Sequence, residues 1–296
     1  MKISNGTRSK LLFTVISILL CVSLALAQPK PAYVLYNAQG QEVDYGDMLR
    51  QASLVDVVLF GELHNNPIAH WLQFELTRGL YELKGPQLIL GAEMFEADNQ
   101  LILNEYLSGQ ITESNFTAQA RLWPNYKTDY KPLVELAKEN GLKFIATNIP
   151  RRYASMVHRG GFEALEGLPA MARLFIAPLP VLYDPELPGY KAMLNMSGMP
   201  AHGSQNFPKA QAIKDATMAH FIVQNLPYGH TFIHYHGTYH SKNYEGIAWY
   251  LQQLAGKTTF MTINTVEQDD PGSLLEEHTG SADFIIVVPS SMTKTY

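Results

Sequence analysis

Short apolar runs, separated by segments of helical length, set the pattern of hydrophobic and polar positions along this chain. Short runs bounded by turn residues are typical of buried strands. They lie at residues 55–60, 88–90, 143–147, 231–236, 258–266 and 283–288. Because these strands alternate with helices, we predict an α/β fold: a mainly parallel central sheet flanked by helices, with a helical or irregular lid insertion.

The segments between the strands carry helix signals. Asn66 is a helix cap, and Pro67 takes the first helical position after it. Four apolar residues then repeat at every fourth position, on one helix face: Ile68, Leu72, Leu76 and Leu80. A second helix over 132–140 ends at Gly141. A third begins near Pro208 and carries four residues at helical spacing: Gln211, Asp215, Met218 and Ile222.

The stretch 178–208 interrupts this alternation. It contains six prolines and little periodicity, which predicts an insertion that forms a lid over the edge of a site. Four of its side chains are candidates for binding a haem cofactor: Tyr183, Tyr190, Met199 and His202. A flexible packing element is the alternative interpretation of the same composition. We place this insertion within a single α/β domain that spans 28–296.

The first residues have the order of a secretory signal peptide. Three cations come first: Lys2, Arg8 and Lys10. An apolar run over 11–24 follows, and Ala-Leu-Ala at 25–27 forms a small-residue cleavage site. We therefore expect a signal peptide at 1–27 and an exported protein. The alternative is an uncleaved membrane anchor, for which the run is barely long enough.

Composition narrows the chemistry. The chain has 22 Lys and Arg against 27 Asp and Glu, a net charge of −5, and no basic run, which argues against nucleic acid as a partner. Loss of the signal peptide would remove three cations and the single cysteine, Cys21, leaving 22 − 3 = 19 cations against 27 acids, a net charge of −8. Any metal or haem must then be held by His, Tyr, Met or carboxylate side chains.

Ionisable residues follow four of the predicted strands. They are His64, Glu93, the pair Arg151 and Arg152, and His240. In parallel α/β sheets, sites form beyond the carboxyl ends of the strands. We therefore expect these side chains to meet at one edge of the sheet.

Imidazole and carboxylate groups are common metal ligands, so we predict that His64, Glu93 and His240 hold a divalent metal ion. If the site hydrolyses a substrate, Glu62 or His236 would act as the catalytic proton carrier. The alternatives are structural: a helix-capping turn after the first strand, a salt bridge at Glu93, and strand-end histidines bonded to nearby backbone.

Two further features bear on the site. Arg151 and Arg152 open the helix after the third strand, where their guanidinium groups and the helix N-terminus would both attract a carboxylate ligand. A solvated arginine pair is the alternative. Asp215 would either orient a site histidine or be an ordinary acid on the helix surface.

The strand-end motifs resemble those of a known family. The two G-x-x-H motifs, at 61–64 and 237–240, are similar to those of the Tiki/TraB/erythromycin-esterase superfamily. The fuller set resembles its ChaN-like branch, the bacterial haem-binding uptake proteins. That set comprises 60–65, 91–95, 148–151, Gln211, Asp215, 218–219 and 236–240. The resemblance extends over residues 55–251, most of the chain.

This resemblance implies an iron-regulated haem-binding protein of the cell envelope, located in the bacterial periplasm or at the outer membrane. In such a protein a homodimer holds two haems and a tyrosine ligates the iron. No motif places this tyrosine, and Tyr183 and Tyr190 are assigned from the composition of the insertion. Arg151 or Arg152 would meet a haem propionate, and envelope haem-transport components are expected partners. Many ChaN-like proteins are lipoproteins, whereas this signal lacks a convincing lipid-attachment site, so peripheral membrane association is left open.

In Tiki-like relatives, the histidines of the two motifs and a glutamate carry metal-dependent hydrolysis. Those positions match His64, Glu93 and His240. Two hypotheses therefore stand side by side: a haem-binding protein of the envelope that serves haem or iron uptake, and a metal-dependent peptidase or esterase. Whether the protein is an enzyme is left open.

Overall fold

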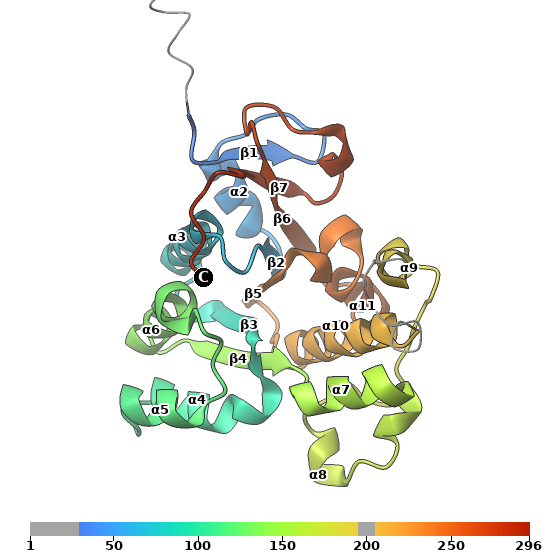
Figure 1. Cartoon of the computed structure of the whole chain (residues 1–296). Helices are drawn as coiled ribbons and strands as arrows, with labels where there is room; N and C mark the ends of the chain where they lie inside the picture. Colours follow the sequence, from blue (N-terminus) through green and yellow to red (C-terminus); the bar gives the residue numbers. More distant parts are fainter. Residues whose placement is uncertain (1–29, 195–204) are drawn as a thin grey trace, which may run out of the picture. The chain divides into compact units, whose positions relative to one another are not determined.

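The described residues of this computed structural model, 30–194 and 205–296, contain one sheet of seven strands (Figure 1). The strands are β1 (Val34–Asn37), β2 (Val57–Glu62), β3 (Leu88–Glu96), β4 (Lys143–Asn148), β5 (Thr231–Gly237), β6 (Phe260–Gln268) and β7 (Phe284–Pro289). Their order across the sheet is β1-β7-β6-β2-β5-β3-β4. Every neighbouring pair is parallel except β1 with β7. The predicted mainly parallel α/β fold is confirmed.

Helices cover both faces of the sheet (Figure 1). One face packs against α2 (Tyr45–Ala52), α3 (Pro67–Lys84), α4 (Gln100–Leu107), α5 (Glu113–Gln119) and α6 (Lys131–Glu139). On the other side lie α7 (Arg151–Gly160), α8 (Ala170–Arg173), α9 (Pro188–Leu194), α10 (Phe207–Gln224) and α11 (Ile247–Leu254). Single-turn helical segments lie at Gly85–Gln87, Ala97–Asn99, Tyr126–Tyr130, Phe162–Leu165, Thr238–His240, Lys242–Tyr244 and Glu276–His278.

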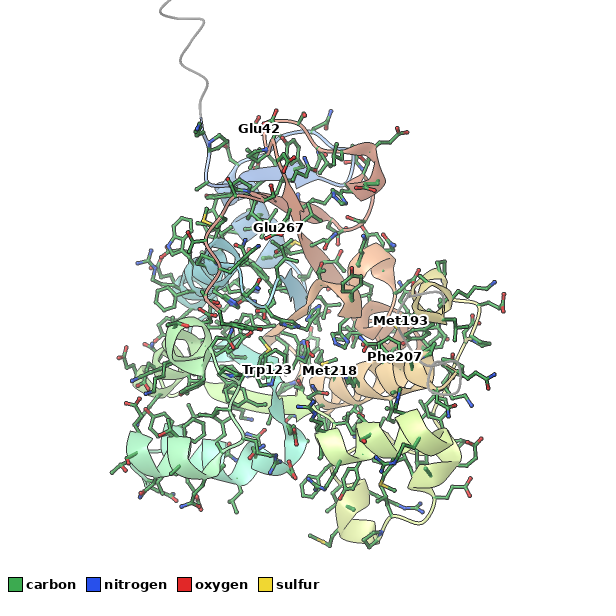
Figure 2. The ribbon with its side chains drawn as sticks, in the orientation of Figure 1. Glu42, Trp123, Met193, Phe207, Met218 and Glu267 are labelled. Atoms are coloured by element: carbon green, nitrogen blue, oxygen red, sulfur yellow. The ribbon has the colours of Figure 1, made fainter. Side chains whose placement is uncertain are left out.

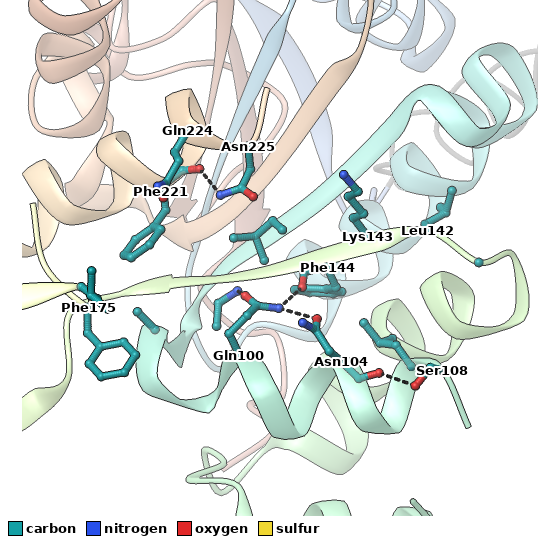
Figure 3. A pocket seen from close by; sticks show the side chains of 16 residues that line it. Gln100, Asn104, Ser108, Leu142, Lys143, Phe144, Phe175, Phe221, Gln224 and Asn225 are labelled. Atoms are coloured by element: carbon teal, nitrogen blue, oxygen red, sulfur yellow. Dashed lines mark hydrogen bonds between the residues drawn. The ribbon is translucent and has the colours of Figure 1, made fainter. Parts of the chain in front are cut away.

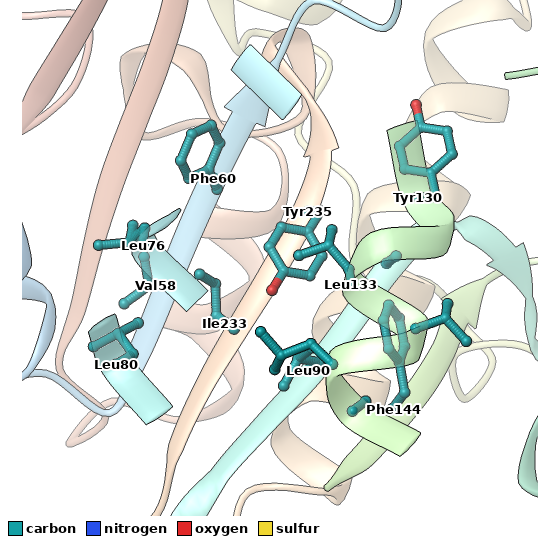
Figure 4. Packing of buried hydrophobic residues seen from close by; sticks show 14 of the residues in the cluster. Val58, Phe60, Leu76, Leu80, Leu90, Tyr130, Leu133, Phe144, Ile233 and Tyr235 are labelled. Carbon is teal, nitrogen blue, oxygen red and sulfur yellow. The ribbon is translucent and has the colours of Figure 1, made fainter. Parts of the chain in front are cut away.

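Alternate residues of each strand point to opposite faces, so the central strands supply two cores. Val58, Ile233 and Tyr235 pack with Leu76 and Leu80 of α3 in the first core (Figure 4). The intervening strand residues form the second core with α7, α10 and α11. Because both faces are covered, strands β2 and β5 are buried along their whole length, which explains the apolar run of β2.

The helix signals of the sequence are confirmed. The side chain of Asn66 accepts hydrogen bonds from the backbone N–H groups of Ile68 and Ala69, at 3.0 and 3.1 Å, and so caps α3. Helix α6 corresponds to the predicted 132–140, and α10 begins one residue before Pro208. Arg151 opens α7, as expected.

Two strands differ from the prediction. Strand β3 runs on to Glu96, so Glu93 lies inside the strand rather than after it. Strand β1 was not predicted, because four residues are too few for a periodic signal and only antiparallel pairing with β7 makes them a strand.

Part of the expected organisation lies outside the described residues. This applies to the predicted signal peptide at 1–27 and to Met199 and His202 of the insertion. Within the insertion, α9 is helical and contacts α10. Tyr33–Tyr296 form one compact unit. Within the described part of the chain, no helix is long and apolar enough to cross a membrane.

Gly61 allows strand β2 to pack closely against its surroundings. A Cβ atom at this position would lie 2.8 Å from the carbonyl oxygen of Ile263 and 3.0 Å from the Cα atom of Thr238. Both neighbours are backbone, so neither can move cheaply. We predict that Gly61→Ala lowers the free energy of unfolding, measured in urea, by about 1–3 kcal/mol.

Gly46→Ala is the matched control. Gly46 lies in α2, and apart from its chain neighbours and the backbone of its own helix, no heavy atom of the described residues lies within 4 Å of the added Cβ position. This change should leave stability unchanged or raise it by about 0.5 kcal/mol. Equal urea midpoints for wild type and Gly61→Ala would contradict the packing argument.

Candidate functional site

The carboxyl ends of three central strands carry a buried polar centre. Glu62 ends β2, Glu93 lies near the end of β3, and the turn after β5 carries His240. Strand β5 lies between β2 and β3 in the sheet, so the three side chains are brought together from distant parts of the sequence. This is the convergence that parallel topology predicts.

His240 lies between two carboxylates. Its Nε2 atom is 3.2 Å from Oε1 of Glu93, and its Nδ1 atom is hydrogen-bonded to Oδ1 of Asp215. The other oxygen of Glu93 accepts the backbone N–H of Gly237 at 2.8 Å, and the other oxygen of Asp215 accepts the hydroxyl of Tyr190 at 2.8 Å. All three ionisable side chains are buried. We call His240, Glu93 and Asp215 the buried triad.

Electrostatic attraction between His240 and the two carboxylates stabilises the buried triad. Burial alone would lower the pKa of His240, but the carboxylates of Glu93 and Asp215 outweigh it and raise the pKa to about 9. Burial alone would raise the pKa of Glu93, but the charge and hydrogen bond of His240 hold it well below its usual range. His240 is therefore an imidazolium ion paired with the Glu93 carboxylate near neutral pH.

A second histidine–carboxylate pair lies beside the buried triad. Nδ1 of His64 is 2.8 Å from Oε1 of Glu62. Glu62 also accepts hydrogen bonds from the hydroxyl of Tyr130 at 2.7 Å and from Nε2 of Gln73 at 2.5 Å. Burial opposes the charge of Glu62, but His70 and His64 lower the pKa of this carboxyl. Burial also opposes the charge of His64, but its bond to Glu62 raises the pKa of the imidazole.

The residues that support Glu62 were missed by the sequence interpretation. His70 is not among the candidates named from the sequence, yet it is buried, 3.5 Å from Glu62 and 3.4 Å from Asp129. The signal that points to these residues is the polar content of α3, where Gln73 and Thr77 are polar yet wholly buried. A buried polar side chain needs a hydrogen-bond partner, and Glu62 is the partner of Gln73.

A polar cavity of about 500 Å³ opens in front of His64. We use this name for the space lined by His64, Glu93, Trp123, Asn148, Arg151 and Lys214, among others. The side chain of His64 is 35% exposed, and its ring meets that of Trp123 edge-on at 4.8 Å (Trp123 is labelled in Figure 2). The structure thus brings together His64, Glu93 and Arg151, as the strand-end positions predict.

Other predicted residues lie elsewhere. Arg152 bonds to Asp98 at 2.6 Å and covers the ring of Tyr153, so it does not line the polar cavity. Asp215 is fully buried against His240, so its interpretation as a surface acid is wrong and the orienting role is the one the geometry shows.

His236 does not reach the polar cavity. Its Nδ1 atom is 2.9 Å from Nδ1 of His234, and its Nε2 atom is 2.8 Å from Oγ of Ser241, all within the buried interior. Burial and the charge of His240 lower the pKa of His236 to about 3, which keeps it neutral. The geometry therefore gives it no part as a proton carrier for this cavity.

The predicted metal site is not supported by the geometry. Among residues 30–194 and 205–296, no group of three or more His, Cys, Asp or Glu side chains could hold a metal ion. The reason is that the expected ligands already bind one another. His240 binds both Glu93 and Asp215, and Nδ1 of His64 is hydrogen-bonded to Glu62.

An apolar cavity of about 430 Å³ lies between α9, α10 and the segment that follows β5. Its lining includes Pro188, Met193, Phe207, Tyr239 and Lys242, and Figure 2 shows Met193 and Phe207 close together between α9 and α10. It shares no lining residue with the polar cavity. Gln211 connects the two, because it lines the apolar cavity while its side-chain amide lies 3.0 Å from Nδ1 of His240.

The tyrosines around the apolar cavity differ in accessibility. Tyr239 lines it and is 71% exposed. Tyr190 is 3% exposed and its hydroxyl bonds to Asp215, while the ring of Tyr183 packs on Phe162 at 5.4 Å. Tyr239 was missed by the sequence interpretation, although it stands inside the second G-x-x-H motif.

A larger cavity, of about 800 Å³, follows the edge strand β4 (Figure 3). Here the side chain of Gln100 takes the place of a neighbouring strand: its Nε2 donates to the carbonyl of Phe144 at 2.9 Å, and its Oε1 accepts the N–H of Ala146 at 2.6 Å. These bonds protect an exposed sheet edge. The cavity contains no cluster of ionisable groups, so its size does not make it the functional site.

The fold and the centre together define an α/β protein with histidine–carboxylate pairs at both G-x-x-H motifs. The family model described as "Haem-binding uptake, Tiki superfamily, ChaN" matches residues 48–251. The chain belongs to this family.

Solved structures agree with this fold. One is "Cofacial heme binding to ChaN of Campylobacter jejuni", with a TM-score of 0.66 and 16% identity over 88% of this chain and 98% of that one. Another is an erythromycin esterase, EreC, in its open conformation, with a TM-score of 0.50 and 11% identity over 90% of this chain and 99% of that one. At these identities, the similarity concerns the fold alone.

A plant protein is also similar in sequence. RETICULATA-RELATED 5, chloroplastic, of Arabidopsis thaliana is 26% identical over 186 residues, which are 58% of this chain and 25% of that protein. The chain thus spans about a quarter of the length of this relative.

The buried triad makes a prediction about pH. The folded-state pKa of His240 is raised from 6.5 to about 9, so its stabilising contribution is fully present below pH 6.5 and is lost as the pH rises through 9. Between these pH values, wild type should lose roughly 1–3 kcal/mol of unfolding free energy relative to His240→Gln, measured in urea. Asp215→Asn, which retains the histidine, should move this loss to lower pH. Parallel pH profiles for wild type and both variants would refute the ion-pair assignment.

Proposed function

We propose that this protein binds haem and is exported to the bacterial envelope, where it serves haem or iron uptake. The observation that carries the proposal is the exposed side chain of Tyr239 beside the apolar cavity. Membership of the haem-binding uptake family and the predicted signal peptide at 1–27 support it.

The residues around the apolar cavity fit the chemistry of haem. A tyrosine oxygen is an established ligand of haem iron. Met193, Phe207 and Pro188 offer apolar contact for the macrocycle, and the ammonium group of Lys242 lies where it can pair with a propionate. The lining thus combines one phenol, an apolar wall and one cation with one carboxylate, Glu245, which accepts the backbone N–H of Gly189 at 2.6 Å.

Tyr239 is preferred over the tyrosines assigned from composition. The hydroxyl of Tyr190 already donates to Asp215, and burial together with the charge of Asp215 raises the pKa of this phenol well above its ordinary value. A phenolate at Tyr190 would therefore be strongly disfavoured. Tyr239 is open to solvent and to an arriving ligand.

The same exposure supports dimerisation on haem binding. A haem seated on the exposed Tyr239 would present its second face to solvent, and a second haem-loaded copy could cover that face. Cofacial haem binding has been described for ChaN of Campylobacter jejuni. We include this homodimer, and transfer of haem to envelope transport components, in the proposal.

Haemin titration tests the ligand. Tyr239→Phe removes the oxygen ligand but keeps the ring, so we expect the affinity for haemin to fall by about tenfold or more, with a changed Soret band in the absorbance titration. Wild type should also double in mass on haemin loading, measured by size-exclusion chromatography with light scattering.

Tyr228→Phe is the matched control, because Tyr228 is also fully exposed but precedes β5 at the opposite end of the strand. Its affinity and spectrum should equal those of wild type, as should those of Tyr183→Phe. An unchanged Soret band and affinity in Tyr239→Phe would remove Tyr239 from the proposal.

Hydrolysis is a second candidate function, and the His64–Glu62 pair favours it. Glu62 fixes Nδ1 of His64, which leaves Nε2 as the free nitrogen. A Cβ atom on Gly237 would lie 2.7 Å from this Nε2 and 3.6 Å from Oε2 of Glu93. Because Gly237 has no side chain, we propose that a water molecule can lie at this position, between a base and a carboxylate. A water there could lose its proton to His64 and attack an ester or amide.

This candidate is tested with a panel of p-nitrophenyl esters and peptide amides. Any hydrolysis by wild type should fall about 100-fold or more in His64→Asn and in Gly237→Ala, because the first removes the base and the second fills the water position. His158→Asn, in α7, is the control and should retain the wild-type rate. A rate that survives His64→Asn would exclude this histidine as the base.

A further inference from the structure

We infer that the polar cavity is a binding site for a small ligand that carries a carboxylate or phosphate group and a hydroxyl beside it. The residues that would bind the anionic group are Arg151 and Lys214. This is the cavity of the hydrolytic candidate, but the inference concerns binding and holds whether or not the ligand is cleaved.

The charges that line the polar cavity do not balance. Arg121 is paired with Glu96 at 3.0 Å and with Asp98, and Glu93 is paired with His240. The acids of the cavity are therefore already matched by cations of the protein. Arg151 and Lys214 form no ion pair with any acidic side chain of the described residues. Two cations facing one cavity without a salt-bridge partner favour an anionic ligand, although the charge of Lys214 also acts on Glu93 and Asp215 from a longer distance.

The two cations come from different helices and reach the same space. Arg151 is the first residue of α7, and Lys214 lies in the middle of α10, which packs against α7. The N-terminus of α7 has no side-chain cap, because Pro150 occupies the cap position. Its first backbone N–H groups and the helix dipole add to the attraction for an anion.

A buried amide gives independent evidence for a ligand. Asn148 lines the polar cavity and is 8% exposed. Its Nδ2 donates to the carbonyl of Glu93 at 2.9 Å, but its Oδ1 has no hydrogen-bond partner in the described structure. A buried acceptor without a partner is costly, and a donor on the ligand would satisfy it. For this reason we include a hydroxyl group in the ligand class.

The remaining walls suit a small molecule. The rings of His64 and Trp123 stand edge-on to each other, so the ligand would lie against an aromatic surface on one side. Because the apolar cavity shares no lining residue with this one, haem at Tyr239 and an anion at Arg151 are separate binding events.

Inorganic phosphate is the first probe, since hydrogen phosphate carries both the negative charge and an O–H donor. Trp123 supplies the signal, through tryptophan fluorescence of the full-length protein at constant ionic strength. We expect a saturable change with phosphate, weaker binding of sulfate, which has no proton to donate at neutral pH, and no saturable change with chloride. The fluorescence change should disappear in Trp123→Phe while calorimetry still detects phosphate binding.

Charge variants test the two cations. Arg151→Gln and Lys214→Gln should each weaken phosphate binding by about tenfold or more, as expected when a charge-assisted hydrogen bond is lost. The matched control is Arg159→Gln in the same helix, whose side chain bonds to Ser155 outside the cavity. Circular dichroism checks that each variant is folded. Wild-type affinity in folded Arg151→Gln and Lys214→Gln, or equal responses to phosphate and chloride, would overturn the inference.

A final experiment distinguishes two possible occupants of the site: a free small ligand and a propionate group of haem, which is also a carboxylate. Phosphate binding that persists at full strength after haemin loading supports a separate small-molecule ligand. Loss of phosphate binding on loading with haemin, but not with haemin dimethyl ester, supports the same anion site with propionate as its occupant. Absence of hydrolysis together with phosphate binding would exclude the hydrolytic candidate and leave this site intact.

Discussion

The imidazolium ion of His240, held between the carboxylates of Glu93 and Asp215, is the interaction on which the rest of the centre depends. It joins strand β3, the turn after β5 and helix α10, three elements that are far apart in sequence. Each group alone would be too costly to bury as an ion, and loss of one partner leaves an uncompensated charge in the interior. The buried triad therefore sets the position of α10, which contributes Gln211 to the lining of one cavity and Lys214 to that of the other.

Those two cavities offer different chemistry. One has an exposed phenol, apolar walls and a single cation, whereas the other has a histidine–carboxylate pair and two cations without an internal partner. The sheet that positions both cavities is similar in fold to a haem-binding ChaN and to an erythromycin esterase. A common α/β sheet can host either chemistry, because function lies in the side chains at the strand ends rather than in the sheet.

Several features could be predicted because they depend on local sequence or simple topology. Asn66 and Pro67 mark the start of α3, and the buried strand β2 can be recognised in the sequence as an apolar run. The meeting of His64, Glu93 and Arg151 follows from parallel strands that end at one edge. The assignment of His64, Glu93 and His240 as metal ligands did not follow from local sequence or topology. Sequence spacing cannot show whether such side chains bind a metal ion or, as here, bind other side chains of the protein.

The sequence by itself determined the fold class, the edge of the sheet where the chemistry lies and the residue types present there. Only the tertiary structure decided which residues pair, which are buried and which stay accessible. Tyr239 and Tyr190 show the difference: both are tyrosines near the second motif in space, yet one is exposed and the other donates to a buried aspartate. Periodicity reports which face of an element is apolar, whereas pairing and accessibility depend on contacts between elements distant in the chain.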